Sequence, residues 1–262
     1  MTNINMPLTD IELPNNKKVF FASDFHLGAP NHHQSRLRED KIISWLNSIA
    51  PQAHTIFLLG DVFDFWFEYK HVIPKGFTRF LGKLASLSDQ GIHIIIFSGN
   101  HDMWMYDYLT KELSIEIYHD PQSVQINNSL LYLGHGDGLG GGDQTYKFLK
   151  KVFRSPVCQW AFRWLHPNIG MAIAHAWSRS SRKKSATADE TFLGDDEWIY
   201  QYCKEVEQNT HHNAYILGHR HLPLDLPVGN RSRYINLGEW ISQYHYASID
   251  HTGNLQLIKY TN

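Results

Sequence analysis

The chain has 262 residues, of which 42% are hydrophobic and 19% charged, with a formal net charge of −2. This composition is typical of a globular protein and excludes a disordered chain, and the balanced charge predicts no obligate nucleic-acid partner. Two cysteines, Cys158 and Cys203, are too few for a disulfide framework. No targeting segment and no apolar run long enough to span a bilayer is found, so a cytoplasmic protein with reduced thiols is expected.

Short apolar runs, each followed by a polar or glycine-rich break, predict buried strands. In chain order they are Lys18–Ala22, Thr55–Leu59, His93–Phe97, Ser129–Leu133, Ala214–Leu217, Arg233–Asn236, Tyr246–Ile249 and Leu255–Lys259. Helical spacing of apolar residues predicts helices over Leu37–Ile49, Phe77–Leu87 and Asp196–Gln208. Strands alternate with helices at the front of the chain and follow one another at its back. This order favours an α/β fold with a mixed sheet, in one domain spanning residues 1–262.

A basic and aromatic segment interrupts the strand series between Leu133 and Ala214. Residues 143–184 hold nine Lys or Arg against one Asp, a formal charge of +8, so the rest of the chain carries −10. The segment also contains Trp160, Trp164 and Trp177. Its apolar residues recur at helical spacing, which predicts a helical lid inserted at about residues 143–200. A basic, aromatic, amphipathic helix is typical of a membrane surface, although tryptophans that merely pack the insertion onto the body would leave the same pattern.

Candidate metal ligands follow the ends of five predicted strands. They are Asp24 and His26, Asp61, Asn100, His135, and His219 with His221. The carboxyl ends of strands in an α/β sheet meet at one edge, so five separate motifs are expected to form one cluster. The remaining histidines, among them His32 and His33 in an expected loop, are assigned no role.

These residue types fit a pair of divalent cations. Alternate residues of an extended chain point the same way, so Asp24 with His26, and His219 with His221, each place two ligands on one side. Asp61 has two carboxylate oxygens with which to bridge two ions. Mixed nitrogen and oxygen ligands without thiolate favour Mn, Fe, Zn or Co. Two such ions hold a bridging hydroxide as nucleophile and clamp the phosphoryl oxygens of a phosphoester.

Two further residues are candidates for catalysis. His101 stands beside Asn100 and is placed to protonate the leaving oxygen or to stabilise the charge that develops there. Asp102 is expected to orient His101, and Asp64 to support the site near Asp61.

Taken together, these motifs resemble those of the calcineurin-like metallophosphoesterases. The matching residues are Asp24-x-His26, Gly60-Asp61-x-x-Asp64, Gly99-Asn100-His101-Asp102, Gly134-His135-Gly136-Asp137 and Gly218-His219-x-His221. The resemblance extends over about residues 17–259. It implies a four-layer α/β/β/α sandwich, a dinuclear metal centre and hydrolysis of a phosphoester or pyrophosphate.

A narrower resemblance is to the UDP-2,3-diacylglucosamine hydrolases of lipid A synthesis. It rests on the segment from His135 to Asp143, on the residues from Tyr146 to His166-Pro167, and on the segment from Gly60 to Trp66. It implies cleavage of a UDP-linked, diacylated sugar to UMP and 2,3-diacylglucosamine 1-phosphate, usually with Mn²⁺, beneath a helical lid. Substrate contacts are then expected from Asn100, His101, Asp143, Arg179 and Lys183, and contact with the inner face of the cell membrane through the lid.

Other functions stay open at this stage. The best-known members of that family carry Arg where this chain has His101, which is the residue typical of general phosphoesterases. A phosphodiesterase, nuclease or protein phosphatase with the same metals is therefore an alternative. A non-catalytic scaffold on this fold is a further alternative, although every expected ligand is present. The sequence does not indicate an oligomeric state.

Overall fold

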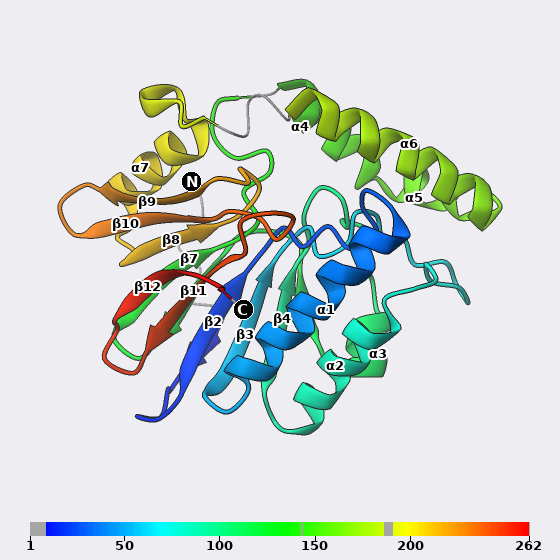
Figure 1. Cartoon of the computed structure of the whole chain (residues 1–262). Coiled ribbons are helices and arrows are strands. Elements are labelled where there is room, and N and C mark those ends of the chain that lie inside the picture. The colour runs from blue at the N-terminus through cyan, green and yellow to red at the C-terminus, as the bar shows by residue number, and fades with distance from the viewer. Residues whose placement is uncertain (1–8, 143, 186–190, 262) are drawn as a thin grey trace.

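Two six-stranded sheets form the centre of the computed structural model, which describes residues 9–142, 144–185 and 191–261 (Figure 1). The first sheet has the order β1 (Thr9–Ile11), β6 (Gln122–Ile126), β7 (Ser129–Leu133), β8 (Ala214–Leu217), β10 (Ser232–Leu237) and β9 (Pro223–Val228). The second has the order β12 (Leu255–Lys259), β11 (His245–Asp250), β2 (Lys18–Ala22), β3 (Ala53–Leu59), β4 (His93–Phe97) and β5 (Glu116–Tyr118). Both sheets contain parallel and antiparallel pairs.

Alternate residues of the central strands enter two different cores, because successive side chains of a strand point to opposite faces. In β2, Val19 and Phe21 lie between the two sheets, while Phe20 and Ala22 face the helices outside the second sheet. Phe21 stacks on Phe57 of β3 at 5.4 Å between ring centroids. The apolar strands predicted from the sequence are apolar throughout because they are covered on both faces.

Helices complete the four layers. α1 (His32–Ile49), α2 (Thr78–Asp89) and α3 (Tyr108–Leu113) pack on the outer face of the second sheet. α7 (Trp198–Asn209), preceded by the short 3₁₀ helix η1 (Gly194–Asp196), packs on the outer face of the first sheet through Ile199 and Cys203. The expected α/β/β/α sandwich is therefore confirmed.

Helix α1 differs from its prediction at its start. It begins at His32, where Asn31 accepts a hydrogen bond from the backbone N–H of Gln34 at 3.0 Å and caps the helix. His32 and His33 therefore lie in the first turn of α1, and the expectation of a loop was wrong. The polar first turns hide the helix from a search for apolar periodicity, and Leu37, the expected first apolar position, is exposed.

The elements that the sequence did not predict are mostly short or at sheet edges: β1, β5, β6, β9 and α3. Strand β9 contains Pro223 and Pro227, which normally argue against a strand. It pairs with β10 and forms the edge of the first sheet. Proline is tolerated at an edge, because the side of the strand without a neighbour needs no N–H for the sheet.

Three helices form the lid, which lies across the upper ends of the strands (Figure 1). They are α4 (Gln144–Phe153), α5 (Pro156–Arg163) and α6 (Pro167–Ser185). Phe162 packs on Phe67 and Trp104, and the indole N–H of Trp104 donates to the carbonyl of Phe153 at 2.9 Å. Within the described residues, no helix is long and apolar enough to cross a membrane.

The lid tryptophans do not attach the lid to the body. Trp160, Trp164 and Trp177 are 62%, 75% and 54% exposed, and phenylalanines make the anchoring contacts instead. The alternative in which the tryptophans pack the insertion onto the body is thus contradicted.

Candidate metal centre

Four of the expected ligands lie within one small volume at the ends of the strands. Ligand atoms of Asp24, His26, Asp61 and His221 all lie within 4.8 Å of one another. His221 Nε2 is 3.2 Å from Asp24 Oδ1 and 3.0 Å from His26 Nε2. Two imidazole nitrogens that face each other beside carboxylates are arranged as ligands around a shared cation. This donor set, with nitrogen and oxygen and no thiolate, fits a borderline divalent metal.

The other expected ligands continue the cluster on the far side of Asp61. His135 Nε2 lies 3.4 Å from Asp61 Oδ2 and 3.2 Å from Asn100 Oδ1. The rings of His135 and His219 are 5.2 Å apart, and the backbone N–H of His219 donates to Asp24 Oδ2 at 3.1 Å. Asp61 therefore stands between two sets of candidate ligands, one drawn from β2 and β8 and one from β4, β7 and β8.

Unpartnered polar atoms support the fit to a metal. Asp24 Oδ1 and His26 Nδ1 are buried and form no well-aligned hydrogen bond within the described ranges, although His221 Nε2 lies 3.2 Å from Asp24 Oδ1. An unsatisfied buried carboxylate oxygen is costly, and a bound cation would compensate for it. The structure thus offers a site that a divalent ion would complete.

Backbone strain is concentrated at the same residues. The φ angles of Asp24, His26, Asp61, His219 and His221 are positive, between 44° and 71°. Such angles are uncommon for residues other than glycine and persist only where surrounding contacts hold them. The backbone N–H groups of Asp24 and His26 donate to the carbonyls of Gly60 and Asp61, at 3.0 and 2.9 Å, which ties the first ligand loop to the second.

Glycines allow the ligand loops to approach one another. A Cβ atom on Gly218 would lie 2.5 Å from Asp24 Oδ2, and one on Gly99 would overlap the carboxylate of Asp61. Neither contact is possible for a real side chain, so these positions exclude every other residue unless the ligands move.

In the metal-free cluster, Asp61 and His219 have the protonation states of metal ligands, whereas His135 is protonated. Burial alone would raise the pKa of Asp61, but neighbouring His135 and His101 outweigh it and lower that pKa. Burial disfavours charge on His135 as well, yet Asp61 and Asp24 raise the pKa of His135 to about 10. Burial and the charge on His135 lower the pKa of His219 to about 4. Ionised carboxylates beside neutral imidazoles are the states that bind metals, and a cation would displace the proton of His135.

His101 lies beside this cluster, and the ring nitrogen on its far side contacts Asp64. Its Nε2 is 4.0 Å from Asp61 Oδ2, while its Nδ1 lies 3.1 Å from the backbone carbonyl of Asp64 and 3.8 Å from Asp64 Oδ1. Because a carbonyl can only accept, Nδ1 carries the hydrogen, and Nε2 faces the cluster. Asp64 Oδ1 is also 3.8 Å from His26 Nδ1, so one carboxylate stands behind both rings.

The contacts of Asp102 differ from those expected of it. Its carboxylate accepts hydrogen bonds from the backbone N–H groups of Gly99, at 2.7 Å, and Phe63, at 3.2 Å. Burial and the nearby charge of Asp61 raise the pKa of Asp102 to about 7. In the described part of the chain, Asp102 therefore joins two ligand loops, whereas Asp64 is the acid beside His101.

The lid residues expected to contact substrate cannot be placed in full. Asp143 lies outside the described residues. Arg179 and Lys183 belong to the C-terminal half of α6, where the structure describes the backbone but not these side chains.

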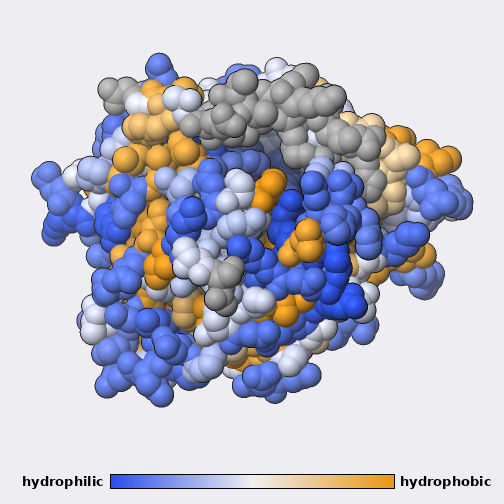
Figure 2. All heavy atoms as spheres, viewed as in Figure 1, coloured by the Kyte–Doolittle hydropathy of each residue, from blue (hydrophilic) through white to orange (hydrophobic). Residues whose placement is uncertain are grey.

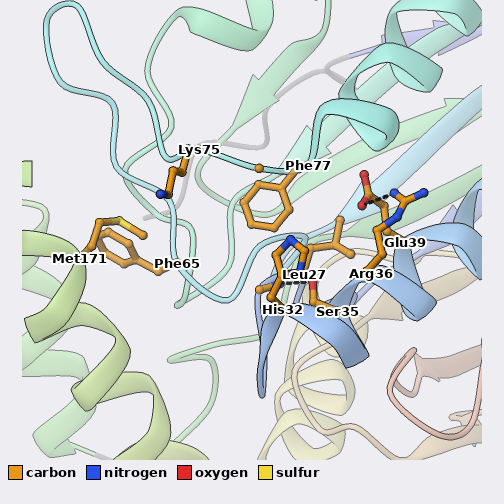
Figure 3. Close-up of a pocket in the computed structure, with 11 residues that line it drawn as sticks. Leu27, His32, Ser35, Arg36, Glu39, Phe65, Lys75, Phe77 and Met171 are labelled. Atoms are coloured by element: carbon orange, nitrogen blue, oxygen red, sulfur yellow. Dashed lines mark hydrogen bonds and ion pairs between the residues drawn. The ribbon is translucent and has the colours of Figure 1, made fainter. Parts of the chain in front are cut away.

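A cavity of about 260 Å³ is lined in part by residues that directly follow His26 and Asp64 in the sequence (Figure 3). It is bounded by Leu27 and Gly28, which follow His26, by Phe65, which follows Asp64, and by Met171 of α6. Its other walls come from α1 and from the loop before α2, through His32, Ser35, Arg36, Glu39, Lys75, Gly76 and Phe77. Met171 of the lid helix α6 lies beside Phe65 on one side of this cavity, and the residues of α1 lie on the other side (Figure 3).

Supporting residues that the sequence did not reveal surround the ligands. The buried guanidinium of Arg38 donates to the carbonyls of Phe25 and His26 at 3.1 and 2.7 Å. Arg220, between the ligands His219 and His221, forms a buried ion pair with Glu197 at 2.7 Å. Their sequence signal is weak, because a charged residue in a helix or between two ligands is usually solvated.

Three curated relatives of the chain share one name. A UDP-2,3-diacylglucosamine hydrolase from Porphyromonas gingivalis is 36% identical to the chain, covering 90% of the chain and 95% of that relative. Proteins of the same name from Pseudomonas aeruginosa and Haemophilus influenzae are 28% and 27% identical, covering 91% and 93% of the chain and 97% and 99% of their own lengths. No family model matches the chain. Among solved structures, vacuolar protein sorting 29 from Cryptosporidium parvum is 10% identical, with a TM-score of 0.42, covering 95% of the chain and all of that protein.

Proposed function

The chain belongs to the UDP-2,3-diacylglucosamine hydrolase family, and on that premise we propose that it hydrolyses the pyrophosphate of UDP-2,3-diacylglucosamine to UMP and 2,3-diacylglucosamine 1-phosphate. The observation that carries the proposal is the buried cluster of Asp24, His26, Asp61 and His221 at the ends of the strands. A cluster of this kind suits hydrolysis of a phosphoanhydride, in which charge develops on phosphoryl oxygens.

Two divalent ions, with Mn²⁺ as the first candidate and Fe, Zn or Co as others, complete the proposed centre. One ion would take Asp24, His26, Asp61 and His221, and the other Asp61, Asn100, His135 and His219. Bound there, the ions supply Lewis-acid stabilisation of the phosphoryl oxygens and lower the pKa of water. The position of Asp61 between the two sets supports its role as the shared ligand.

His101 is the proposed proton donor to the leaving oxygen. Its Nδ1–H is engaged by Asp64, so Nε2 is the atom available for proton transfer, and Nε2 faces Asp61 and the cluster. Asn100 and His101 are also proposed to contact the substrate phosphate.

The lid is proposed to bind the lipid part of the substrate and to touch the inner face of the cell membrane. It exposes a hydrophobic set that is unusual for a surface: Phe148, Val152, Val157, Trp160, Trp164, Ile169, Ile173 and Trp177. Hydrophobic surface is visible at the outer end of the lid, at the right of Figure 2. Asp143, Arg179 and Lys183 are proposed to contact the sugar and phosphates, for which the cationic charge of the segment is suited.

The first test is release of UMP from UDP-2,3-diacylglucosamine by chelator-treated protein, with and without added Mn²⁺. We expect UMP only with metal. Asp61→Asn should lose both bound metal and UMP release, while Asp40→Asn, the same change at an exposed carboxylate, should lose neither.

The assay also separates the alternatives. Metal-dependent cleavage of an aryl phosphodiester without UMP release would retain the centre and reject the lipid substrate, in favour of a phosphodiesterase with another substrate. Metal-loaded protein inert towards both would reject the hydrolase and favour a scaffold.

A further inference from the structure

The lid helix α6 sits unusually close to the segment that carries Asp64. Among the side chains of α6 that the structure describes, the buried ones are Gly170, Ala174 and Ser178, small residues four apart on one side of the helix. A Cβ atom on Gly170 would lie 2.5 Å from the hydroxyl oxygen of Tyr69. The helix can therefore approach Asp64 closely enough for a short side chain to reach it.

Ser178 makes that contact. Its side chain is 2% exposed, and its hydroxyl donates to Asp64 Oδ1 at 2.8 Å. The hydroxyl oxygen of Ser178 also lies 3.3 Å from Nδ1 of His101. The hydroxyl is therefore shared between the carboxylate, to which it donates, and the ring N–H, towards which it presents a lone pair.

The Asp64 carboxylate that Ser178 contacts lies beside two histidine rings. Asp64 Oδ1 is 3.8 Å from Nδ1 of both His26 and His101, and these rings are nearly perpendicular, with centroids 5.0 Å apart. Partners behind a ligating or proton-transferring imidazole fix its tautomer and orientation. Among the described residues, two oxygens lie within hydrogen-bond distance of His101 Nδ1: the backbone carbonyl of Asp64 at 3.1 Å and the hydroxyl of Ser178 at 3.3 Å. Loss of the Ser178 hydroxyl would therefore remove one of the two contacts that hold the ring with Nε2 towards the cluster.

We propose that Ser178 is a positioning residue through which the lid helix α6 holds Asp64 and the ring of His101, so that the proton donor is oriented by the same element that covers the substrate. The inference rests on the proposed function of His101 as that donor. Ser178 itself touches no reacting atom.

Ser178→Ala tests this with little risk to the fold, because it removes one buried oxygen and no carbon. Ser155→Ala is the matched control: Ser155 lies in the lid, where its hydroxyl accepts from the backbone N–H of Cys158 at 3.2 Å and caps α5. Both variants should bind as much Mn²⁺ as the unaltered protein.

Turnover should reveal the role through its dependence on the leaving group. With aryl phosphodiesters in Mn²⁺, Ser178→Ala should lower kcat about 10- to 100-fold for a phenyl ester, whose weak leaving group needs a proton. Its kcat for a p-nitrophenyl ester, which departs without one, should be little changed. His101→Ala should show the same pattern, and Ser178→Ala should have no added effect in that background. Ser155→Ala should leave the ratio of the two kcat values unaltered.

A measurement in the metal-free protein makes the test independent of activity. The Nδ1–H proton of His101, assigned by its loss in His101→Ala, should exchange with solvent about tenfold faster in Ser178→Ala, as expected when a supporting partner is lost, and at an unaltered rate in Ser155→Ala. Unaltered exchange, equal losses of kcat with both esters, or additive losses with His101→Ala would each overturn the proposal.

These outcomes are separable from a failure of the proposed substrate. If the protein cleaves aryl esters but releases no UMP, the substrate assignment fails and the Ser178 test stands. If UMP is released and Ser178→Ala behaves like Ser155→Ala, only the inference about Ser178 fails.

Discussion

Asp24 combines three properties that are seldom found together. It is fully buried, its backbone has a φ of 56°, and its Oδ1 forms no well-aligned hydrogen bond within the described ranges. Each property costs stability in the absence of a metal, and the strained backbone alone costs about 1–3 kcal/mol. A bound cation would offset the electrostatic part of this cost but not the backbone strain.

Asp24→Asn and Asp24→Ala should separate these two contributions. Asparagine tolerates a positive φ and keeps one oxygen for the N–H of His219. The free energy of unfolding of metal-free Asp24→Asn should therefore lie within about 1 kcal/mol of that of the unaltered protein. The free energy of unfolding of metal-free Asp24→Ala should be lower than that of Asp24→Asn by about 1–3 kcal/mol. Mn²⁺ at 100 times its Kd should stabilise the unaltered protein by about 2.7 kcal/mol, and neither variant should gain this.

Urea unfolding with and without Mn²⁺ measures both effects. Equal destabilisation of the two metal-free variants would show that strain at this position is unimportant. A full Mn²⁺ shift in Asp24→Asn would remove Asp24 from the ligand set.

Much of the site could be predicted from residue types and their places in the sequence. The seven expected ligands follow strands whose carboxyl ends meet, and the structure brings these residues together. The partner of His101 could not be predicted, because Asp64 and Asp102 are both acids close to a ligand in sequence. Only the fold shows that Asp102 turns towards backbone N–H groups and Asp64 towards the ring. The role of Ser178 could not be predicted from the sequence, because its partner Asp64 is 114 residues away along the chain.

At the scale of the elements, the loop after β8 is fixed to the start of α7. Arg220 lies between the ligands His219 and His221, whose backbones are left-handed, with φ of 71° and 49°, rather than extended. Its guanidinium pairs with Glu197 through two contacts, at 2.7 and 3.0 Å, and both side chains are buried. The pair therefore sets the position of two ligands from outside the cluster.

Arg220→Met should destabilise the protein by about 3–5 kcal/mol, because it leaves the carboxylate of Glu197 buried without this partner. The double variant Arg220→Met with Glu197→Met should recover much of that loss, since both charges are then gone. Lys111→Met, which breaks an exposed pair with Asp107, should cost less than about 1 kcal/mol. The single variant Glu197→Met completes the cycle. Chemical unfolding of the unaltered protein and the four variants gives these differences, and a double variant whose loss equals the sum of the two single losses would contradict the coupling.

The elements themselves were predictable where one periodicity dominated. Strands β2, β4 and β8 were bounded correctly because they are short apolar runs covered on both faces. The start of α1 and the edge strand β9 were missed for opposite reasons. The first turns of α1 are capped by Asn31 and bury polar side chains such as Ser35 and Arg38 instead of apolar ones. Strand β9 carries prolines, which an edge position tolerates.

The whole molecule has a marked separation of charge. The segment from residue 143 to 184 carries +8 and the rest of the chain −10, and the described helices of this segment form the lid. An anionic surface would attract the lid and repel the body, which orients the molecule with its exposed tryptophans towards that surface. The aromatic residues would then enter the headgroup region, while the basic residues meet the lipid phosphates.

The protein should therefore bind vesicles containing anionic phosphatidylglycerol more tightly than vesicles of neutral phosphatidylcholine, and added salt should weaken the difference. The double variant Trp160→Ser with Trp164→Ser should lose binding to both about tenfold or more, because it removes apolar surface from the most exposed part of the lid. Leu37→Ser removes a similarly exposed apolar side chain from α1, on the body, and should bind as the unaltered protein does. Co-sedimentation with vesicles measures all three. The lid is not the membrane-facing surface if the tryptophan variant binds vesicles as tightly as the unaltered protein, or if Leu37→Ser loses as much binding as the tryptophan variant. The exposed side chains of the lid would then serve the acyl chains of the substrate alone.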